Sequence, residues 1–480
     1  MHTSVASTAS PRPALLLLLA LFLASGLFAF VNQSTYDSGD SLNHYLYARY
    51  AFQHPTNFLE SWSKPVVVLL HALPAQAGLR GVMLFQCVCA AGAAWLAYGT
   101  ARRLQLPWPW LAILFVYACP DYFRIQYSGL TEPLFSVVLM ASVALAVAQR
   151  PVWAAAVLSF LPFVRSEGFL LLGVLGVYLL GVRAWRALPW LGLGFVVYGV
   201  AGWLVYHDFW WVFTRNAYPL REALYGHGEP LYFLKNLPEV TGWVQYALLW
   251  LGGWQAVQEW RRPAIRRQPA LFWAELLLVY GGVVVYVGAH TLFWWQGIFA
   301  SFGLMRVIDG IVPLLALVAL NGVHFLSTRL RSAAAHARLQ QGVVAAAVLV
   351  LFLGLRAGFR WRRDFTLASE QLLGHKLTAQ LPSRPLPRVL YAHPVIPYAL
   401  EIDPFDKCQA GSFGIIRDGL PVSPGTLAIW DDWYASAENG VPLAQLQRDP
   451  RYRVRWRGTA PRNRFKPTTD SVRFVVFERL

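Results

Sequence analysis

Residues 13–50 read PALLLLLALFLASGLFAFVNQSTYDSGDSLNHYLYARY, an apolar run that passes directly into a polar, acidic stretch. Residues 13–31 carry no charge, and about 20 apolar residues are enough for a helix to cross a bilayer. Asp37 and Asp40 follow within ten residues of that run. The run is long for a secretory signal and follows Arg12, so we expect an uncleaved first helix that starts on the cytoplasmic side.

The composition of the whole chain agrees with a membrane protein. Of its 480 residues 56% are hydrophobic and 14% are charged, whereas a soluble domain carries about 25% charged residues. These values exclude an ordinary soluble enzyme and a disordered or fibrous chain. The net charge of +16 fits basic cytoplasmic loops better than nucleic-acid binding, so we expect no nucleic-acid partner. The four cysteines form no CxxC motif or Cys/His cluster that would indicate a structural metal.

Apolar stretches recur along the chain to residue 358. They predict an all-α polytopic membrane protein with about eleven transmembrane helices. The predicted spans are 13–31, 79–101, 108–120, 133–149, 152–164, 168–182, 188–206, 243–258, 271–289, 308–327 and 341–358. Residues 66–77 are too few to span and contain a proline, so they predict an interfacial or re-entrant helix. The connections 32–65 and 207–242 are predicted as long outer loops.

Charged residues divide between the two sides of this map. Arginines such as Arg102, Arg150 and Arg183 fall in connections on one side, which the positive-inside rule makes cytoplasmic. Acids such as Asp40 and Glu132 fall on the other side. The two distributions give the same orientation. They predict a multi-pass protein of a bacterial inner membrane, with its active site outside the cytoplasm.

The composition changes after residue 358. Residues 359–480 are polar and rich in Arg and Pro, and 388–402, 425–435 and 471–480 contain strand-like patterns. About 120 residues are enough for one small α/β domain. We therefore predict a transmembrane catalytic domain over 1–358 and an extracytoplasmic soluble α/β domain over 359–480. Asp431 and Asp432 are interpreted as a loop or strand end rather than as a nucleotide-sugar site.

The first outer connection holds the first group of candidate site residues. Asp40 and His44 share one face of a helix if residues 40–48 are helical. One of Asp37 and Asp40 is expected to cap that helix, but ionisable groups at membrane depth are also functional candidates. Trp62 and Lys64 follow in the sequence WSKP. Lys64 either extends to lipid headgroups or binds a lipid phosphate, and the sequence leaves both readings open.

Later outer turns supply the remaining candidates. Glu132 lies between Thr131 and Pro133, which is good chemistry for a helix start and equally a position for a functional acid. Arg165 and Glu167, in RSEG, form either an internal ion pair or part of a site. Arg306, at the outer end of a span, is the strongest candidate for binding phosphate, because its planar fork fits phosphate oxygens.

No phosphate-binding P-loop, GxGxxG, GxSxG or HExxH motif is present. ATP hydrolysis, dinucleotide chemistry and zinc proteolysis therefore lack support.

Taken in order, YDSGDSLNHYLYA, WSKP, SGLTEP, RSEG and FGLMRVIDGIVP resemble the GT-C superfamily of membrane glycosyltransferases. Its members use polyprenyl-phosphate-linked sugars and include protein O-mannosyltransferases, the lipid A aminoarabinose transferase and mannosyltransferases of glycan assembly. The resemblance covers residues 13–327 and implies that Asp40 or Asp37 is the general base. It also implies that Glu132 is the second acid and that Arg306 and Lys64 hold the donor phosphate.

We add Arg165 to the candidate phosphate ligands, and His44, Glu167 and Trp62 to the candidate substrate ligands. No metal ligand is assigned, and a divalent metal is left open because some family members bind one and others do not. The expected activity is an inverting transfer of one hexose (such as mannose) or pentose from a polyprenyl phosphate to a lipid, glycan or protein acceptor. The alternatives are a polymerase or ligase of lipid-linked oligosaccharides and a membrane transporter or flippase.

Overall fold

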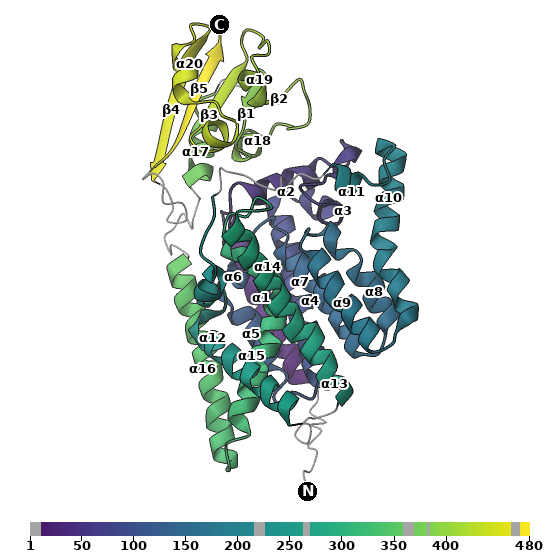
Figure 1. Ribbon diagram of the computed structural model, residues 1–480. Coiled ribbons are helices and arrows are strands. Elements are labelled where there is room, and N and C mark those ends of the chain that lie inside the picture. Colours follow the sequence, from purple (N-terminus) through teal and green to yellow (C-terminus); the bar gives the residue numbers. More distant parts are fainter. Residues whose placement is uncertain (1–10, 216–225, 263–268, 359–368, 382–384, 462–470) are drawn as a thin grey trace.

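The computed structural model describes residues 11–215, 226–262, 269–358, 369–381, 385–461 and 471–480 (Figure 1). A helical body is followed by a small domain that contains a β-sheet. The described N-terminus lies at one end of the body, and the sheet domain lies beyond the opposite end, next to α2 (Asp40–Arg49). The predicted domain boundary at 358/359 stays a prediction, since residues 359–368 lie outside the described part.

The body contains helices of very different lengths. In chain order they are α1 (Arg12–Val31), α2 (Asp40–Arg49), η1 (Pro55–Leu59), α3 (Pro65–Ala75), α4 (Leu79–Arg103), α5 (Leu111–Ala118), α6 (Pro120–Ile125), α7 (Glu132–Val147), α8 (Pro151–Leu158), η2 (Leu161–Phe163), α9 (Gly168–Gly181), η3 (Trp185–Gly192), α10 (Leu193–Tyr206), α11 (Trp211–Thr214), α12 (Tyr232–Arg261), α13 (Pro269–Ala274), the π-helical η5 (Glu275–Gly281), α14 (Gly282–Gln296), η6 (Met305–Ile311), α15 (Val312–Ser327) and α16 (Ala333–Gly358).

Within the described residues, six helical segments are long and apolar enough to cross a membrane. They are Arg12–Val31, Leu79–Arg103, Trp185–Tyr206, Leu271–Gln296, Met305–Ser327 and Ala333–Gly354. They identify the chain as an integral membrane protein. Each of the other predicted spans also contains a helix, but those helices are shorter or less apolar, so the predicted number of about eleven spans is not confirmed.

The centre of the body is α15, whose residues Val312–Val323 are all buried. It packs closely against α12 because glycines replace larger residues at the contact. A Cβ on Gly252 would overlap the backbone carbonyl of Val318, and one on Gly322 would overlap that of Leu248. Small residues at such positions let helix backbones approach in a membrane, where burial of apolar side chains gives little driving force.

The prediction of an outer loop over 207–242 is wrong for its last part. Residues 232–242 form the first turns of α12, which bends at Gly242 with φ +73°. Phe233, Leu237 and Val240 are buried at helical spacing, and this packing outweighs the presence of Pro238. The sequence signal was hidden because Pro238 and Glu239 interrupt the apolar pattern.

The sheet domain has five strands in the order β2-β1-β3-β5-β4. β1 is parallel to β2 and β3, and β5 is antiparallel to β3 and β4. Its elements are α17 (Ser369–Thr378), β1 (Val389–Tyr391), α18 (Val395–Leu400), β2 (Ala410–Ser412), α19 (Gly414–Arg417), β3 (Leu427–Asp431), the π-helical turn η7 (Tyr434–Glu438), α20 (Leu443–Arg448), β4 (Tyr452–Pro461) and β5 (Ser471–Arg479).

The strand predictions near 425–435 and 471–480 are confirmed, and Asp431 ends β3 as expected. The strand prediction over 388–402 is wrong beyond Tyr391, because Pro394 precedes a short helix there. Proline has a fixed φ that suits a helix start and lacks the N–H that a strand ladder needs. β4 had no clear sequence signal, since three of its first six residues are arginines and none of these six side chains is buried.

The sheet domain contacts the segments that flank α2 through several polar bonds. Ser34 Oγ donates to Gln371 Oε1 at 2.9 Å, and Ser38 Oγ donates to Glu370 Oε2 at 3.1 Å. His54 Nε2 lies 2.8 Å from Asp403 Oδ2. The segment between α1 and η1, which carries Asp37 and Asp40, is therefore in contact with the sheet domain.

Candidate active site

The first cluster joins the loop after α1 to η6, more than 260 residues later in the chain. Arg306 Nη1 donates to Asp37 Oδ2 at 2.8 Å, and Arg306 Nη2 donates to Asp40 Oδ2. The arginine side chain is 9% exposed, while those of Asp37 and Asp40 are 31% and 35% exposed. One buried guanidinium thus holds two partly accessible carboxylates, each on a separate nitrogen.

The capping interpretation of these acids is wrong. α2 begins at Asp40 with Gly39 as its N-cap, and neither acid makes a side-chain cap bond. Asp37 Oδ1 instead accepts the Gly39 N–H at 2.6 Å, within the loop that precedes the helix. Since capping does not account for either acid, their place beside Arg306 is the feature that needs a functional explanation.

A second cluster centres on Arg165, in the turn between η2 and α9. Arg165 Nη1 donates to Glu132 Oε1 at 2.6 Å, and Arg165 Nη2 donates to Glu167 Oε1 at 2.8 Å. The internal ion pair proposed for the RSEG turn is present, and it extends to the acid that opens α7. His290 Nε2, from α14, lies 3.7 Å from Glu167 Oε1. Sequence reasoning missed His290, which stands within an apolar helix without a motif.

The electrostatics of this cluster favour ionised Glu167. Burial opposes its charge, but Arg165 and His290 outweigh burial and lower the pKa of Glu167 to about 2. Glu132 is fully buried, and its Oε2 has no hydrogen-bond partner within the described part of the chain. A buried carboxylate oxygen without a partner is costly, so Glu132 is placed to accept a hydrogen bond from a bound molecule.

Lys64 lies close enough to the second cluster for the charges of Glu167 and Arg165 to act on it. Burial lowers the pKa of Lys64 to about 8, while Glu167 raises it and Arg165 lowers it. The backbone of Lys64 has φ +71°, a conformation that costs a residue with a Cβ about 1–3 kcal/mol. Such strain just before Pro65 indicates that the position of Lys64 is fixed by the surrounding structure. Its role as a phosphate ligand stays a prediction.

His44 and Trp62 pack together at the edge of this region. Their rings stack with centroids 4.6 Å apart, and His44 Nδ1 lies 2.9 Å from Ser63 Oγ. Burial lowers the pKa of His44 well below its usual value, so the ring is neutral at pH 7. This neutral pair offers an aromatic surface and a hydrogen-bonding edge rather than a charge.

A third polar group centres on Asp121, in α6. Tyr36 Oη lies 2.9 and 3.0 Å from the two carboxylate oxygens of Asp121. Arg124 Nη1 lies 3.5 Å from Asp121 Oδ1 and its guanidinium stands over the Tyr36 ring. Because Tyr36 directly precedes Asp37, this group adjoins the first cluster. Fully buried Asp309, three residues after Arg306, faces Asp121 and Glu132.

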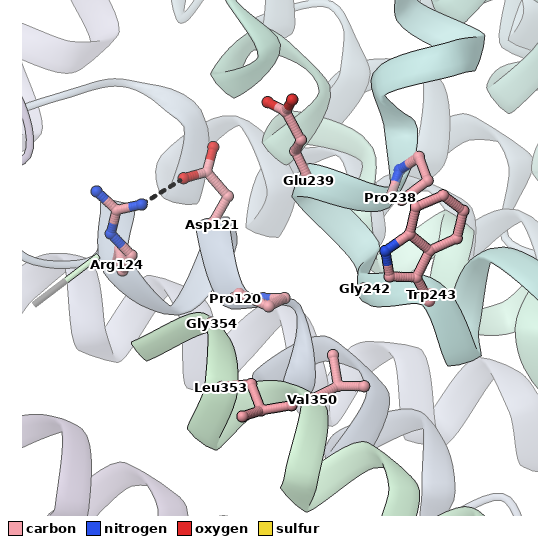
Figure 2. Close-up of a pocket in the computed structure, with 10 residues that line it drawn as sticks. All are labelled: Pro120, Asp121, Arg124, Pro238, Glu239, Gly242, Trp243, Val350, Leu353 and Gly354. Atoms are coloured by element: carbon pink, nitrogen blue, oxygen red, sulfur yellow. Dashed lines mark ion pairs between the residues drawn. The ribbon is translucent and has the colours of Figure 1, made fainter. Parts of the chain in front are cut away.

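A cavity of about 330 Å³ opens beside Asp121, between α6, α12 and α16. Figure 2 shows the Asp121–Arg124 ion pair on one wall, Val350 and Leu353 on another, and Trp243 opposite. We call it the side cavity. It does not include Asp37, Asp40 or Arg306, and Tyr36 connects it to them. Among the described residues, no group of three or more His, Cys, Asp and Glu side chains is arranged to hold a metal ion.

The sequence matches no family model and no curated protein. Its structure, however, is similar along nearly its whole length to a solved structure. The crystal structure of ArnT from Cupriavidus metallidurans in the apo state matches with a TM-score of 0.62 and 14% identity, covering 97% of this chain and 98% of that one. The ArnT structure bound to undecaprenyl phosphate matches with a TM-score of 0.60, the same identity and the same coverage.

The chain has the fold of ArnT. The match extends over nearly the whole of both chains, and at 14% identity it shows a shared fold. The ArnT fold here includes the sheet domain, because the match extends over 97% of the chain and is not confined to residues 13–327.

Proposed function

We propose that this protein is an inverting glycosyltransferase that moves one sugar from a polyprenyl phosphate to an acceptor outside the cytoplasm. The observation that carries the proposal is the Asp37–Arg306–Asp40 cluster, a pair of accessible carboxylates on one buried guanidinium. The ArnT fold supports a polyprenyl-phosphate donor, because one of the matched ArnT structures is bound to undecaprenyl phosphate. The proposal leaves the sugar and the acceptor open.

In the proposed reaction, the acceptor hydroxyl attacks the anomeric carbon while a carboxylate takes its proton. A hydroxyl is a weak nucleophile, so the base must lie within hydrogen-bond reach of it. We assign this role to Asp40, with Asp37 as the alternative, because both are partly exposed. The bond from the anomeric carbon to the phosphate oxygen breaks, and a single displacement inverts the configuration at that carbon.

The leaving group is a polyprenyl phosphate, whose added negative charge needs cations. Arg306 has three N–H groups beyond the two that bind Asp37 and Asp40, so it can contact phosphate without losing either carboxylate. Lys64 supplies a second cation close to Arg165 and Glu167. Cations placed where charge develops are among the largest contributions to catalysis.

The second cluster is assigned to the sugar. The unpartnered Glu132 Oε2 is suited to accept a sugar hydroxyl, and Arg165 and Glu167 hold Glu132 in place through the ion pairs. The stacked His44 and Trp62 rings offer an apolar face of the kind on which sugar rings pack.

The test uses the purified full-length protein in detergent with polyprenyl-phosphate mannose, glucose and arabinose, each with and without EDTA. We expect sugar release from one of these lipids by the wild type, and at least about 100-fold slower release by Asp40→Asn. Asp418→Asn is the matched control, since Asp418 is an exposed acid of the sheet domain that pairs with neighbouring Arg417.

Each outcome has a defined reading. Release that survives Asp40→Asn but is lost in Asp37→Asn assigns the base to Asp37. Release lost only with EDTA assigns a metal to the reaction. If the wild type neither releases sugar from these lipids nor binds them, the glycosyltransferase proposal is wrong and transport becomes the leading function.

A further inference from the structure

A tyrosine of the sheet domain reaches the acidic cluster of the body. Tyr434 begins η7, directly after β3, and its hydroxyl lies against Gly39, between Asp37 and Asp40 in sequence. A Cβ added to Gly39 would overlap Tyr434 Oη and would lie 3.1 Å from both Tyr434 Cζ and Asp37 Oδ1. The hydroxyl and the Asp37 carboxylate therefore face the same point of the loop, and no side chain fits there.

The turn that carries Tyr434 is held by one buried acid. Asp431 is fully buried, and its carboxylate accepts backbone N–H groups of Trp433, Tyr434 and Ala435 at 3.0, 2.6 and 3.1 Å. Asn439 Nδ2 donates to the Tyr434 carbonyl at 2.9 Å. The tyrosine is thus fixed at the end of a central strand rather than on a loose loop, which is the way precise sites are supported.

The same turn also contacts the segment that leads to Arg306. The Trp433 and Phe302 rings lie with centroids 6.1 Å apart, and Phe302 stands four residues before Arg306. One turn of the sheet domain therefore touches both chain segments that form the Asp37–Arg306–Asp40 cluster. The His393 ring packs edge-on against the Tyr434 ring, with their centroids 4.8 Å apart.

The protonation state of Tyr434 suits a hydrogen-bond donor. Burial raises the pKa of Tyr434 well above its usual value, and the charges of Asp40 and Asp37 raise it further. The phenol is therefore neutral, and ionised carboxylates offer it only acceptor atoms.

We propose that Tyr434 is a positioning residue that orients the Asp37–Asp40 carboxylates, so that the sheet domain completes the active site. This inference rests on the proposed function, in which one of these acids is the general base. The Tyr434 hydroxyl, held against Gly39 beside the Asp37 carboxylate, restricts the rotation of the aspartate side chains. Gly39 is required because any side chain would displace the hydroxyl.

The first experiment compares Tyr434→Phe with Tyr452→Phe in the full-length protein. Tyr452 is a half-buried tyrosine of β4 under Arg479, in the same domain, and serves as the matched control. We expect Tyr434→Phe to lower kcat for sugar transfer by about 10- to 100-fold, the range of a lost hydrogen bond to a charged group, with donor KM changed less than twofold. Tyr452→Phe should leave both constants at wild-type values.

The second experiment needs no activity, so it separates this inference from the proposed function. Gly39→Ala and Tyr434→Phe are combined in a cycle of thermal unfolding in detergent. Gly39→Ala should lower Tm in the wild-type background and lower it clearly less with Tyr434→Phe, because removing Oη vacates the place that the new Cβ needs.

The results divide cleanly. Additive Tm changes would overturn the contact itself, whether or not the protein transfers sugar. Coupled Tm changes with an unchanged kcat in Tyr434→Phe, or a raised KM alone, would overturn the positioning role. If the wild type transfers no sugar and the Tm changes are coupled, the proposed function is wrong. The contact between Tyr434 and Gly39 is then established, but it has no catalytic role.

Discussion

Arg306→Lys is the substitution that best tests how the acidic cluster is built. Arginine bonds Asp37 through Nη1 at 2.8 Å and Asp40 through Nη2, so two separate nitrogens of one rigid plane serve two carboxylates. Lysine keeps the charge but concentrates it on a single flexible nitrogen. It cannot reproduce the spacing of the two bonds, and at least one of them must be lost.

The magnitude follows from burial and charge. A hydrogen bond to a charged group contributes about 1.5–3 kcal/mol, and the aspartates are 31% and 35% exposed, which favours the lower end through solvent screening. We expect Arg306→Lys to lower the free energy of unfolding by about 1.5 kcal/mol. Arg306→Gln leaves two carboxylates without their cation and should cost more, about 3 kcal/mol.

The assay is thermal unfolding of each variant in one detergent, with sugar release from the polyprenyl donor measured in parallel. Asp37→Asn provides the second side of a double-mutant cycle. With Asp37 neutral, one of the two bonds is already weakened, so Arg306→Lys should cost less than in the wild type. Transfer by Arg306→Lys should be about 100-fold slower, the typical effect of losing a group that stabilises transition-state charge.

One result would refute this reasoning. If Arg306→Lys unfolds like the wild type and only raises the KM for the donor, then Arg306 serves the phosphate alone and does not organise the acids. Additive effects of Arg306→Lys and Asp37→Asn on unfolding would lead to the same conclusion.

Three further substitutions test other parts of the structure. Glu167→Gln should lower the free energy of unfolding at pH 7 by about 3 kcal/mol, because the lowered pKa of Glu167 stabilises the fold above pH 4.5. The free energy of unfolding of the wild type should therefore fall as the pH drops from about 4.5 to about 2, and a flat curve in that range would contradict this. Burial raises the pKa of Asp431 to about 7, so the folded protein holds this proton more tightly than the unfolded chain. Unfolding followed by Trp fluorescence should therefore show the free energy of unfolding decreasing from pH 4 to pH 7 by up to about 4 kcal/mol, and Asp431→Asn should abolish this decrease. Leu353→Trp fills the side cavity and should raise the KM for a polyprenyl donor several-fold if the chain lies there. Val348→Trp, at an exposed position of the same helix that does not line the cavity, should leave this KM unchanged; equal effects would remove the cavity from the site.

The fold class could be predicted from the sequence because a membrane imposes simple rules. Apolar length marks helices, and charge marks the sides of the bilayer. The predicted number of spans is not confirmed, since apolar length does not separate a helix that crosses the membrane from one that is buried among its neighbours. α5 (Leu111–Ala118) is entirely buried and only eight residues long, yet its letters read like those of a span.

Many members of the two charged clusters could be singled out from the sequence, because charge beside an apolar run is costly. Asp37, Asp40, Glu132 and Arg165 were all singled out as charges beside apolar runs. Their pairing could not be predicted, because it depends on contacts between segments far apart in the chain. Arg306 was assigned to a phosphate, and the structure adds that the same guanidinium holds both aspartates. Tyr434 carries no local sequence signal at all, as a tyrosine in a polar tail resembles any other.

The Arg306 geometry links the two halves of the proposed reaction. A general base must stand on one side of the anomeric carbon and the leaving phosphate on the other, so their separation has to be fixed before the acceptor attacks. Two N–H groups of Arg306 bind the aspartates, and three remain for phosphate oxygens on the same rigid plane. A single planar cation can therefore set the distance between base and leaving group, which neither a lysine nor two separate cations would do. The proposed reaction therefore requires arginine at position 306 for its planar shape as much as for its charge.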